Sequence, residues 1–145
     1  MIILDTNVIS ACMRPTKHKA VIDWLNRQPI ENLWTTTVTL FELRYGIEKL
    51  NPDDERKGGL DAAWQDFASV IFADRILPFD ARAARASADL AATRQKARRS
   101  VDMRDTFIAG IVLSREATLA TRNSRDFADA GIALIDPWTA RKPSI

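Results

Sequence analysis

Short apolar runs alternate with longer amphipathic stretches along this chain, and this alternation constrains the fold more than any other feature. The opening run at residues 2–4, Ile-Ile-Leu, is continuously apolar, which is typical of a strand covered on both faces. Further short runs stand at residues 33–36, 75–79, 118–120 and 132–135, separated by stretches with helical spacing. The pattern predicts an α/β fold with a central, mostly parallel sheet.

Helices are predicted between these strands from apolar spacing and capping residues. The expected ranges are 8–13, 19–26, 40–50, 51–71, a long helix that Asp80 caps and that runs past Arg94, and 103–116. The segment 51–54, Asn-Pro-Asp-Asp, has the composition of a helix start. Gly46 lies inside a predicted helix, where glycine costs about 1 kcal/mol relative to alanine, so we expect another backbone to approach it closely.

Length and composition indicate one globular domain. The chain has 145 residues, of which 46% are hydrophobic and 28% are charged. No repeat, low-complexity tract or linker rich in Pro, Gly or Ser divides it, so we expect a single domain over residues 1–145. The opening residues do not resemble a signal peptide, and the longest apolar run, 108–113, is far short of the ~20 residues that span a bilayer. We therefore expect a cytoplasmic protein without membrane contact.

The charge is nearly balanced, so nucleic-acid binding would depend on a local patch. The chain has 21 Lys and Arg against 19 Asp and Glu, a net charge of +2. One basic patch, Arg94, Lys96, Arg98 and Arg99, stands at the predicted end of the long helix. It fits either a solvated helix end favoured by the helix dipole or a binding footprint for phosphates.

The single cysteine and single histidine exclude several classes of site. One cysteine rules out a disulfide within the chain, and the pair is too few for a structural zinc site. We expect His18 to be a solvated loop residue, and Cys12 to pack in an apolar helix. Any chemistry must therefore come from acidic residues.

Four acidic residues stand where surface exposure is not the obvious explanation. Asp5 follows the first predicted strand, where an open parallel sheet binds ligands, and Asp126 lies in the segment after the strand at 118–120. Glu42 and Asp105 lie on predicted helices. Each also has a structural interpretation: Asp5 as a helix cap, Glu42 as a solvated side chain, Asp126 as a first-turn carboxylate, and Asp105 as the partner of Asp102 in a capping box.

Together these acids point to a metal ion. Ionised carboxylates about 5 Å apart repel each other by roughly 3 kcal/mol per pair at an effective dielectric near 20. A cluster of them persists only when it is protonated or neutralised by a cation. Oxygen ligands without histidine or thiol favour Mg²⁺ or Mn²⁺, ions that bind phosphate oxygens and activate water.

Four segments resemble the motifs of one known family. They are residues 4–10 (Leu-Asp-Thr-Asn-Val-Ile-Ser), 39–46 (Thr-Leu-Phe-Glu-Leu-Arg-Tyr-Gly), 105–109 (Asp-Thr-Phe-Ile-Ala) and 119–127 (Leu-Ala-Thr-Arg-Asn-Ser-Arg-Asp-Phe). In this order and spacing they resemble PIN-domain nucleases, most of all the VapC/FitB-type toxins of bacterial type II toxin–antitoxin systems. The resemblance spans almost the whole chain, to the ending at residues 136–138, Asp-Pro-Trp.

This resemblance implies a PIN-like α/β/α sandwich and a Mg²⁺- or Mn²⁺-dependent endoribonuclease. It also implies a homodimer with a cognate antitoxin, with DNA contacted only through that antitoxin. By position, the implied catalytic acids are Asp5, Glu42, Asp105 and Asp126. Asp5, Asp105 and Glu42 are the implied metal ligands.

The polar residues around these acids receive weaker roles. Asp126 would bind metal through water, or Asn123 would complete the site as a polar group. Thr6 and Thr121 would position water or phosphate, and Asp102 is expected to be a helix cap.

The expected reaction is hydrolysis of an RNA phosphodiester bond. Glu42 would orient or deprotonate the attacking water. Because the chain has no histidine pair, we expect products with 5′-phosphate and 3′-hydroxyl ends. One alternative is a catalytically weak PIN-fold module that acts mainly through antitoxin binding and DNA regulation. A phosphatase of the haloacid dehalogenase type is a further alternative, but it would have Asp-x-Asp where this chain has Asp5-Thr6-Asn7.

Overall fold

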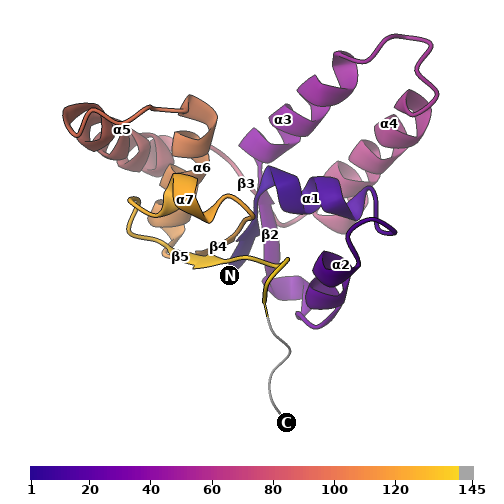
Figure 1. The fold of residues 1–145 in the computed structure, drawn as a ribbon, viewed down its shortest axis with the longest axis horizontal. Helices are drawn as coiled ribbons and strands as arrows, with labels where there is room; N and C mark the ends of the chain where they lie inside the picture. The colour runs from indigo at the N-terminus through magenta and orange to yellow at the C-terminus, as the bar shows by residue number, and fades with distance from the viewer. Residues whose placement is uncertain (141–145) are drawn as a thin grey trace.

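The computed structural model describes residues 1–140, so residues 141–145 of the predicted domain lie outside the described residues. Its centre is a five-stranded sheet in the order β3-β2-β1-β4-β5, with every neighbouring pair parallel. Helices lie on both sides of this sheet, giving the α/β/α arrangement (Figure 1). The predicted fold class is confirmed, and the sheet is entirely parallel.

The elements follow one another in the alternating order that parallel sheets require. The strands are β1 (Ile2–Leu4), β2 (Leu33–Thr36), β3 (Ile76–Leu77), β4 (Thr118–Ala120) and β5 (Ala133–Ile135). The helices are α1 (Thr6–Cys12), α2 (Lys19–Asn26), α3 (Thr37–Glu48), α4 (Lys57–Asp66), α5 (Ala81–Lys96), α6 (Met103–Arg115) and α7 (Ser124–Phe127), with a 3₁₀ turn η1 (Ile30–Asn32) and a π-helical segment η2 (Phe67–Ile71). Among residues 1–140, no helix is long and apolar enough to cross a membrane.

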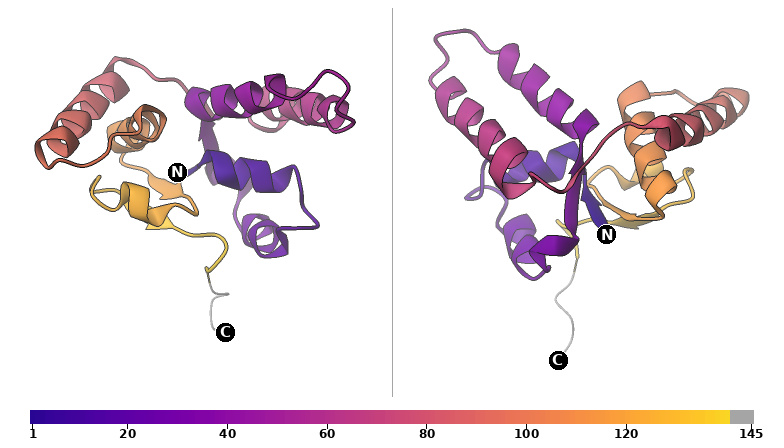
Figure 2. Two further views of the ribbon diagram at one scale, coloured as in Figure 1. Left: turned by 45° about the horizontal axis from the view of Figure 1, so that its top comes forward. Right: turned by 180° about the vertical axis from the view of Figure 1, so that it is seen from behind.

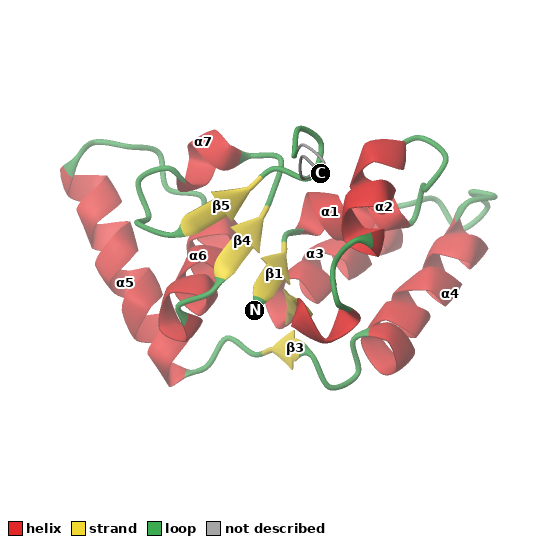
Figure 3. Ribbon diagram, turned by 90° about the horizontal axis from the view of Figure 1, so that it is seen from below, coloured by secondary structure: helices red, strands yellow, loops and turns green. Residues whose placement is uncertain are grey.

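The sheet separates two apolar cores. Successive residues of a strand point to opposite faces, so Ile3 of β1 packs with α5 and α6, whereas Leu4 packs with α1 and α2. Leu119 and Ala120 of β4 divide between the two cores in the same way. Both faces are therefore buried, which explains why the first strand is continuously apolar. Figures 2 and 3 show α5, α6 and α7 on one side of the sheet and α1 to α4 on the other.

Most predicted elements are confirmed, and one helix start is wrong. The strands at 2–4, 33–36 and 118–120 and the helix at 19–26 begin and end as predicted. The segment 51–54 does not start a helix, because α4 begins only at Lys57. There the Asp54 carboxylate accepts a hydrogen bond from the backbone N–H of Arg56 (2.9 Å), which closes an Asx turn instead of a helix cap.

The close backbone approach predicted at Gly46 occurs at a different glycine. Among the described residues, a Cβ added to Gly46 would meet no atom within 4 Å. A Cβ on Gly110 of α6 would lie 1.8 Å from Ser87 Oγ and 2.7 Å from the carbonyl oxygen of Ala83, both in α5. Gly110 therefore allows α5 and α6 to pack closely, and α6 carries one of the predicted site residues.

Candidate active site

The candidate site lies where the chain order reverses in the sheet. From β1 the chain continues to β2 and β3 on one side, while β4 and β5 lie on the other. Open parallel sheets bind ligands outside the carboxyl ends of the strands at such a point. Asp5 directly follows β1 and Thr121 directly follows β4, and Thr121 Oγ1 donates a hydrogen bond of 2.6 Å to Asp5 Oδ2.

Asp5 is almost fully buried, with 3% of its surface exposed. Its Oδ1 accepts a hydrogen bond from the backbone N–H of Thr6 (2.8 Å), so Asp5 caps α1 as one interpretation of the sequence proposed. Burial raises the pKa of Asp5, while the hydrogen bonds from Thr121 and Thr6 act in the opposite direction. Asp5 therefore combines a capping role with a position in the acidic cluster.

Glu42 reaches the same region from α3. Thr6 Oγ1 donates to Glu42 Oε1 (2.9 Å) and lies 3.3 Å from Thr39 Oγ1, so hydroxyl groups connect α1 and α3 at the site. Arg104 Nη1 is 3.8 Å from Glu42 Oε2. Burial raises the pKa of Glu42, and the negative charges of Asp5 and Asp102 add to that effect. Glu42 is therefore not the fully solvated helix residue of the structural interpretation.

Asp105 stands in the first turn of α6, and more neighbouring acids raise its pKa than raise that of Asp5 or Glu42. Its pKa is raised to about 7, first by burial and then by the charges of Asp102, Asp5, Glu42 and Asp126. Asp102 caps α6, since its Oδ1 accepts from the backbone N–H of Asp105 (3.2 Å). Asp102 is thus both the predicted cap and a nearby acidic side chain that the sequence interpretation left out of the site.

The fourth acid and the weaker polar candidates lie in and before α7. Asp126 is exposed, and its charge raises the pKa of both Asp5 and Asp105. Asn123 occupies the N-cap position of α7 without a side-chain capping hydrogen bond, and its backbone N–H donates to Thr121 Oγ1 (3.0 Å). The structure therefore brings Asp126 into the acidic cluster, while Asn123 supports Thr121 through its backbone.

Arg94 corrects the interpretation of the predicted basic patch. Lys96, Arg98 and Arg99 are exposed, but Arg94 is only 4% exposed and belongs to the inner face of α5. The signal was available, because Ala83, Leu90 and Arg94 share one buried helical stripe.

The Arg94 guanidinium connects three segments near the acids. It donates two hydrogen bonds of 2.9 Å to the Asp129 carboxylate, one of 3.0 Å to Thr106 Oγ1 and one of 2.8 Å to the carbonyl of Asp126. Thr106 neighbours Asp105 in α6. Arg94 therefore fixes the backbone next to two of the acidic residues.

The donor set suits a hard divalent cation. Among residues 1–140, no three acidic, histidine or cysteine side chains form a group that could hold a metal ion as they stand. Like charges repel at short range. The charges of Asp5 and Glu42 raise the pKa of Asp105, and at Glu42 the charge of Arg104 acts against that of Asp5. This unbalanced cluster of oxygen donors fits Mg²⁺ or Mn²⁺.

The two other reactive side chains lie elsewhere. Cys12 packs against the α1–α2 core, and burial raises the pKa of its thiol to about 11, as expected for a packing residue. His18 lies before α2 and is half-buried, instead of fully solvated as predicted. Its ring makes an edge contact with Trp138 (centroids 5.8 Å apart), and Trp138 Nε1 lies 3.4 Å from His18 Nδ1.

Comparisons with known proteins agree with this geometry. The family model of the PIN domain matches residues 2–133. The chain is 40% identical to the plasmid stability protein StbB of Pseudomonas syringae pv. tomato, covering 97% of this chain and 100% of that protein. It is 34% identical to the VapC ribonuclease Y4jK of Sinorhizobium fredii, covering 95% of this chain and 98% of that protein.

A solved structure extends the match to three dimensions. The structure of FitAB bound to an IR36 DNA fragment contains a chain that superposes with a TM-score of 0.87 at 30% identity, covering 99% of this chain and 100% of that one. These relatives cover almost the full length of the fold. The chain therefore belongs to the PIN-domain family, within which it is a VapC/FitB-like toxin.

Proposed function

We propose that this VapC-type ribonuclease toxin is a Mg²⁺- or Mn²⁺-dependent endoribonuclease that hydrolyses RNA at its acidic cluster. The observation that carries the proposal is the gathering of acids around Asp105 near the carboxyl ends of β1 and β4, where the charges of Asp5, Glu42 and Asp126 raise its pKa. Carboxylates gathered this closely at a ligand-binding edge of the sheet are unfavourable unless a cation is bound there.

Asp5, Asp105 and Glu42 would hold the ion. A divalent cation of this type neutralises the carboxylates and polarises the scissile phosphate when bound. Glu42 orients the attacking water or accepts its proton, held in place by the hydroxyl of Thr6. Thr121 fixes the Asp5 carboxylate, and Asp126 contributes charge from α7. Thr6 and Thr121 therefore act mainly on the acids, and Asn123 acts through its backbone N–H on Thr121.

The proposed partners follow from the family. We expect a homodimer with a cognate antitoxin, and DNA contact only through that antitoxin; the solved structure of the relative FitAB is likewise bound to a DNA fragment. An enzyme that cleaves cellular RNA and is inhibited by an antitoxin acts in the cytoplasm.

The decisive experiment is cleavage of a structured RNA pool by the purified, partner-free chain with Mg²⁺, Mn²⁺ or EDTA, compared with Asp5→Asn. We expect cleavage that requires the metal and disappears in the variant, with 5′-phosphate and 3′-hydroxyl product ends. Equal cleavage by both proteins would identify a contaminating nuclease. Products with 2′,3′-cyclic phosphates would contradict hydrolysis by water.

A second candidate function is a PIN-fold module with negligible turnover that acts through its antitoxin. A chain that had lost catalysis would have no need to keep Asp105 at a pKa of about 7 among four other carboxylates. A folded chain that binds Mn²⁺ but cleaves no RNA would favour this alternative.

A further inference from the structure

A basic groove leads away from Glu42, first between α1 and α3 and then toward the start of α4. Its near part is a hollow of about 280 Å³ that Thr6 and Glu42 line at one end and Arg14 and Arg56 at the other. Its far part is a hollow of about 520 Å³ between the loop after α1 and the start of α4. Met13, Arg14, Arg56 and Leu60 line both hollows, so the two adjoin, and together they are called here the α1–α4 groove.

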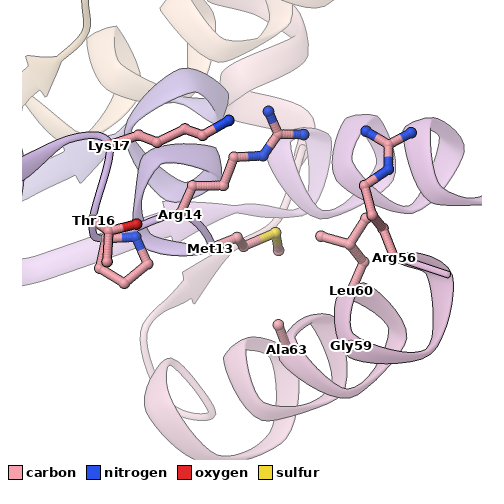
Figure 4. A pocket seen from close by; sticks show the side chains of 9 residues that line it. Met13, Arg14, Thr16, Lys17, Arg56, Gly59, Leu60 and Ala63 are labelled. Carbon is pink, nitrogen blue, oxygen red and sulfur yellow. The ribbon is translucent and has the colours of Figure 1, made fainter.

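The far part of this groove has a cationic rim and an apolar floor. Figure 4 shows Arg14 and Lys17 on the α1 side and Arg56 on the α4 side, with Met13 and Leu60 facing the space between them. No acidic residue lines this part of the groove within residues 1–140. The lining therefore attracts an anion and offers an apolar surface beside it.

The two cations on the α1 side are available for a ligand. Arg14 and Lys17 are exposed, and their side chains form no ion pair within the described part of the chain. Arg56 differs, because its guanidinium is held by the Asp54 carboxylate (Nη2–Oδ2 2.9 Å), which offsets its charge. Arg14 and Lys17 thus carry the unbalanced positive charge of the groove.

We propose that the α1–α4 groove is a binding subsite for single-stranded RNA on one side of the scissile phosphate. Arg14 and Lys17 bind the phosphates, and Met13 and Leu60 contact the face of an unstacked base. The inference rests on the proposed nuclease function, since the groove begins at Glu42. Positive charges beside the acidic cluster attract the phosphate backbone of the substrate, which the carboxylates themselves would repel.

An RNA strand fits the groove better than an acidic peptide does. A phosphodiester chain has a charge at every nucleotide and an apolar base face next to it, which matches a rim of cations along an apolar floor. Glu42 lines the near hollow, which adjoins the far one, so a strand bound across both would reach the acids where cleavage is proposed.

The test measures RNA binding separately from cleavage. Fluorescence anisotropy in EDTA gives the affinity of a labelled single-stranded RNA for the wild-type chain and for the double variant Arg14→Gln, Lys17→Gln. The matched control is Arg82→Gln, Arg85→Gln, which removes the same charge from exposed positions of α5. We expect about tenfold weaker binding for the groove variant, and a salt dependence shallower by about 1.4, since each phosphate contact on a single strand contributes about 0.7.

Cleavage assays with Mg²⁺ then separate a binding role from a structural one. The groove variant should raise KM for a long RNA with little change in kcat, and should cleave a dinucleotide as the wild type does. Equal loss of RNA affinity in the groove and control variants would overturn the subsite, even if the chain is an active nuclease. Wild-type binding that depends on Arg14 and Lys17 without any cleavage would instead overturn the nuclease function alone. If labelled polyglutamate loses more affinity than RNA in the groove variant, the groove binds an acidic polypeptide and the RNA proposal is wrong.

Discussion

Asp105 and Asp126 are held on one side of the sheet by a buried guanidinium, whereas Glu42 is held on the other side by hydroxyl groups. Arg94 is 4% exposed, and its guanidinium donates hydrogen bonds to Thr106 of α6, to Asp126 of α7 and to Asp129, two residues after α7. Thr6 lies on a more open surface and contributes one neutral donor to Glu42. A buried guanidinium is costly to disturb, while a half-exposed hydroxyl is not.

The same contrast appears in how the helices pack. The α5 and α6 helices approach so closely at Gly110 that a Cβ would overlap Ser87, whereas Gly46 on α3 faces open space within the described structure. The α5–α6–α7 side is therefore rigid around the acids it carries, and the α1–α3 side has room to adjust. This difference suggests that one side fixes the acidic cluster while the other adapts to the substrate, and it can be tested by paired substitutions.

The largest effect is expected for Arg94→Met. It removes two hydrogen bonds from the Asp129 carboxylate and the guanidinium donor of the Thr106 hydroxyl and the Asp126 carbonyl, so we expect a loss of about 3 kcal/mol in the free energy of unfolding. The matched control is Arg99→Met, since Arg99 also pairs with Asp129 (3.5 Å) but is 48% exposed, and its loss should be below about 1 kcal/mol. Urea unfolding measures both. Similar losses in the two variants would contradict the structural role given to Arg94.

The next effect concerns the same substitution on the two sides of the sheet. Gly110→Ala places a Cβ 2.7 Å from the Ala83 carbonyl and against Ser87, so we expect destabilisation by about 2 kcal/mol. Gly46→Ala has no such contact and should stabilise α3 by up to about 1 kcal/mol. Adding Ser87→Gly to Gly110→Ala should restore only part of the loss, because the carbonyl contact remains. Thermal unfolding of the variants would reveal opposite signs if the contrast holds.

Arg94 and Gly110 also mark the limit of prediction from the sequence. Apolar runs located the strands, because burial on both faces leaves a continuous hydrophobic pattern. Acids directly after strands located Asp5, since the carboxyl ends of parallel strands share one edge. The helical spacing of Arg94 from Ala83 and Leu90 indicates burial, but its partner Asp129 is 35 residues away, and that pairing depends on tertiary packing. The close packing at Gly110 likewise depends on which helix lies beside it, and composition does not encode that.

Local competition between motifs explains the wrong helix start. The segment 51–54 has residues that cap helices, but the same Asp54 carboxylate binds the N–H two residues later and closes a turn. The acids of the site were easier to identify because four of them share chemistry, whereas Asp102 was set aside because one role, the cap, already accounted for it. A residue with two roles is identified in full only when its neighbours in space are known.

Because Asp105 is partly buried among other carboxylates, removing its charge should increase the free energy of unfolding. Without a divalent cation, the raised pKa means that the folded chain keeps a proton between about pH 4 and pH 7 that the unfolded chain has lost. The free energy of unfolding therefore falls as the pH rises through this window. Asp105→Asn removes this penalty, so at pH 8 in EDTA we expect a gain of about 1 kcal/mol, discounted for solvent screening.

The matched variant on the other side of the sheet is Glu42→Gln. Its gain should be smaller, because Arg104 already lies 3.8 Å from the Glu42 carboxylate and offsets part of the repulsion. Both variants should lose metal-dependent RNA cleavage. Urea unfolding at pH 5 and pH 8 checks the sign: if Asp105→Asn is less stable than the wild type at pH 8, the acids do not repel each other as inferred.

The smallest effect is expected for Thr6→Val, which removes the single neutral hydrogen bond to Glu42. The free energy of unfolding should fall by only about 0.5 to 1 kcal/mol, because the hydroxyl is partly solvated and Glu42 keeps Arg104 nearby. Cleavage should suffer more than stability, since Glu42 would no longer be held in one orientation. The control is Thr93→Val on α5, whose hydroxyl donates only to the carbonyl of Asp89 in its own helix (2.9 Å).

The two threonine variants sharpen the comparison because they change stability alike and differ in function. If Thr6 positions Glu42, Thr6→Val lowers kcat several-fold at unchanged RNA affinity, and Thr6→Ser, which keeps the hydroxyl, restores it. Thr93→Val leaves kcat unchanged. A normal kcat in Thr6→Val would mean that Glu42 finds its working orientation without help from α1. The orientation of Glu42 would then be set by the bound ion and substrate, and only the acids next to Arg94 would be in position before they bind.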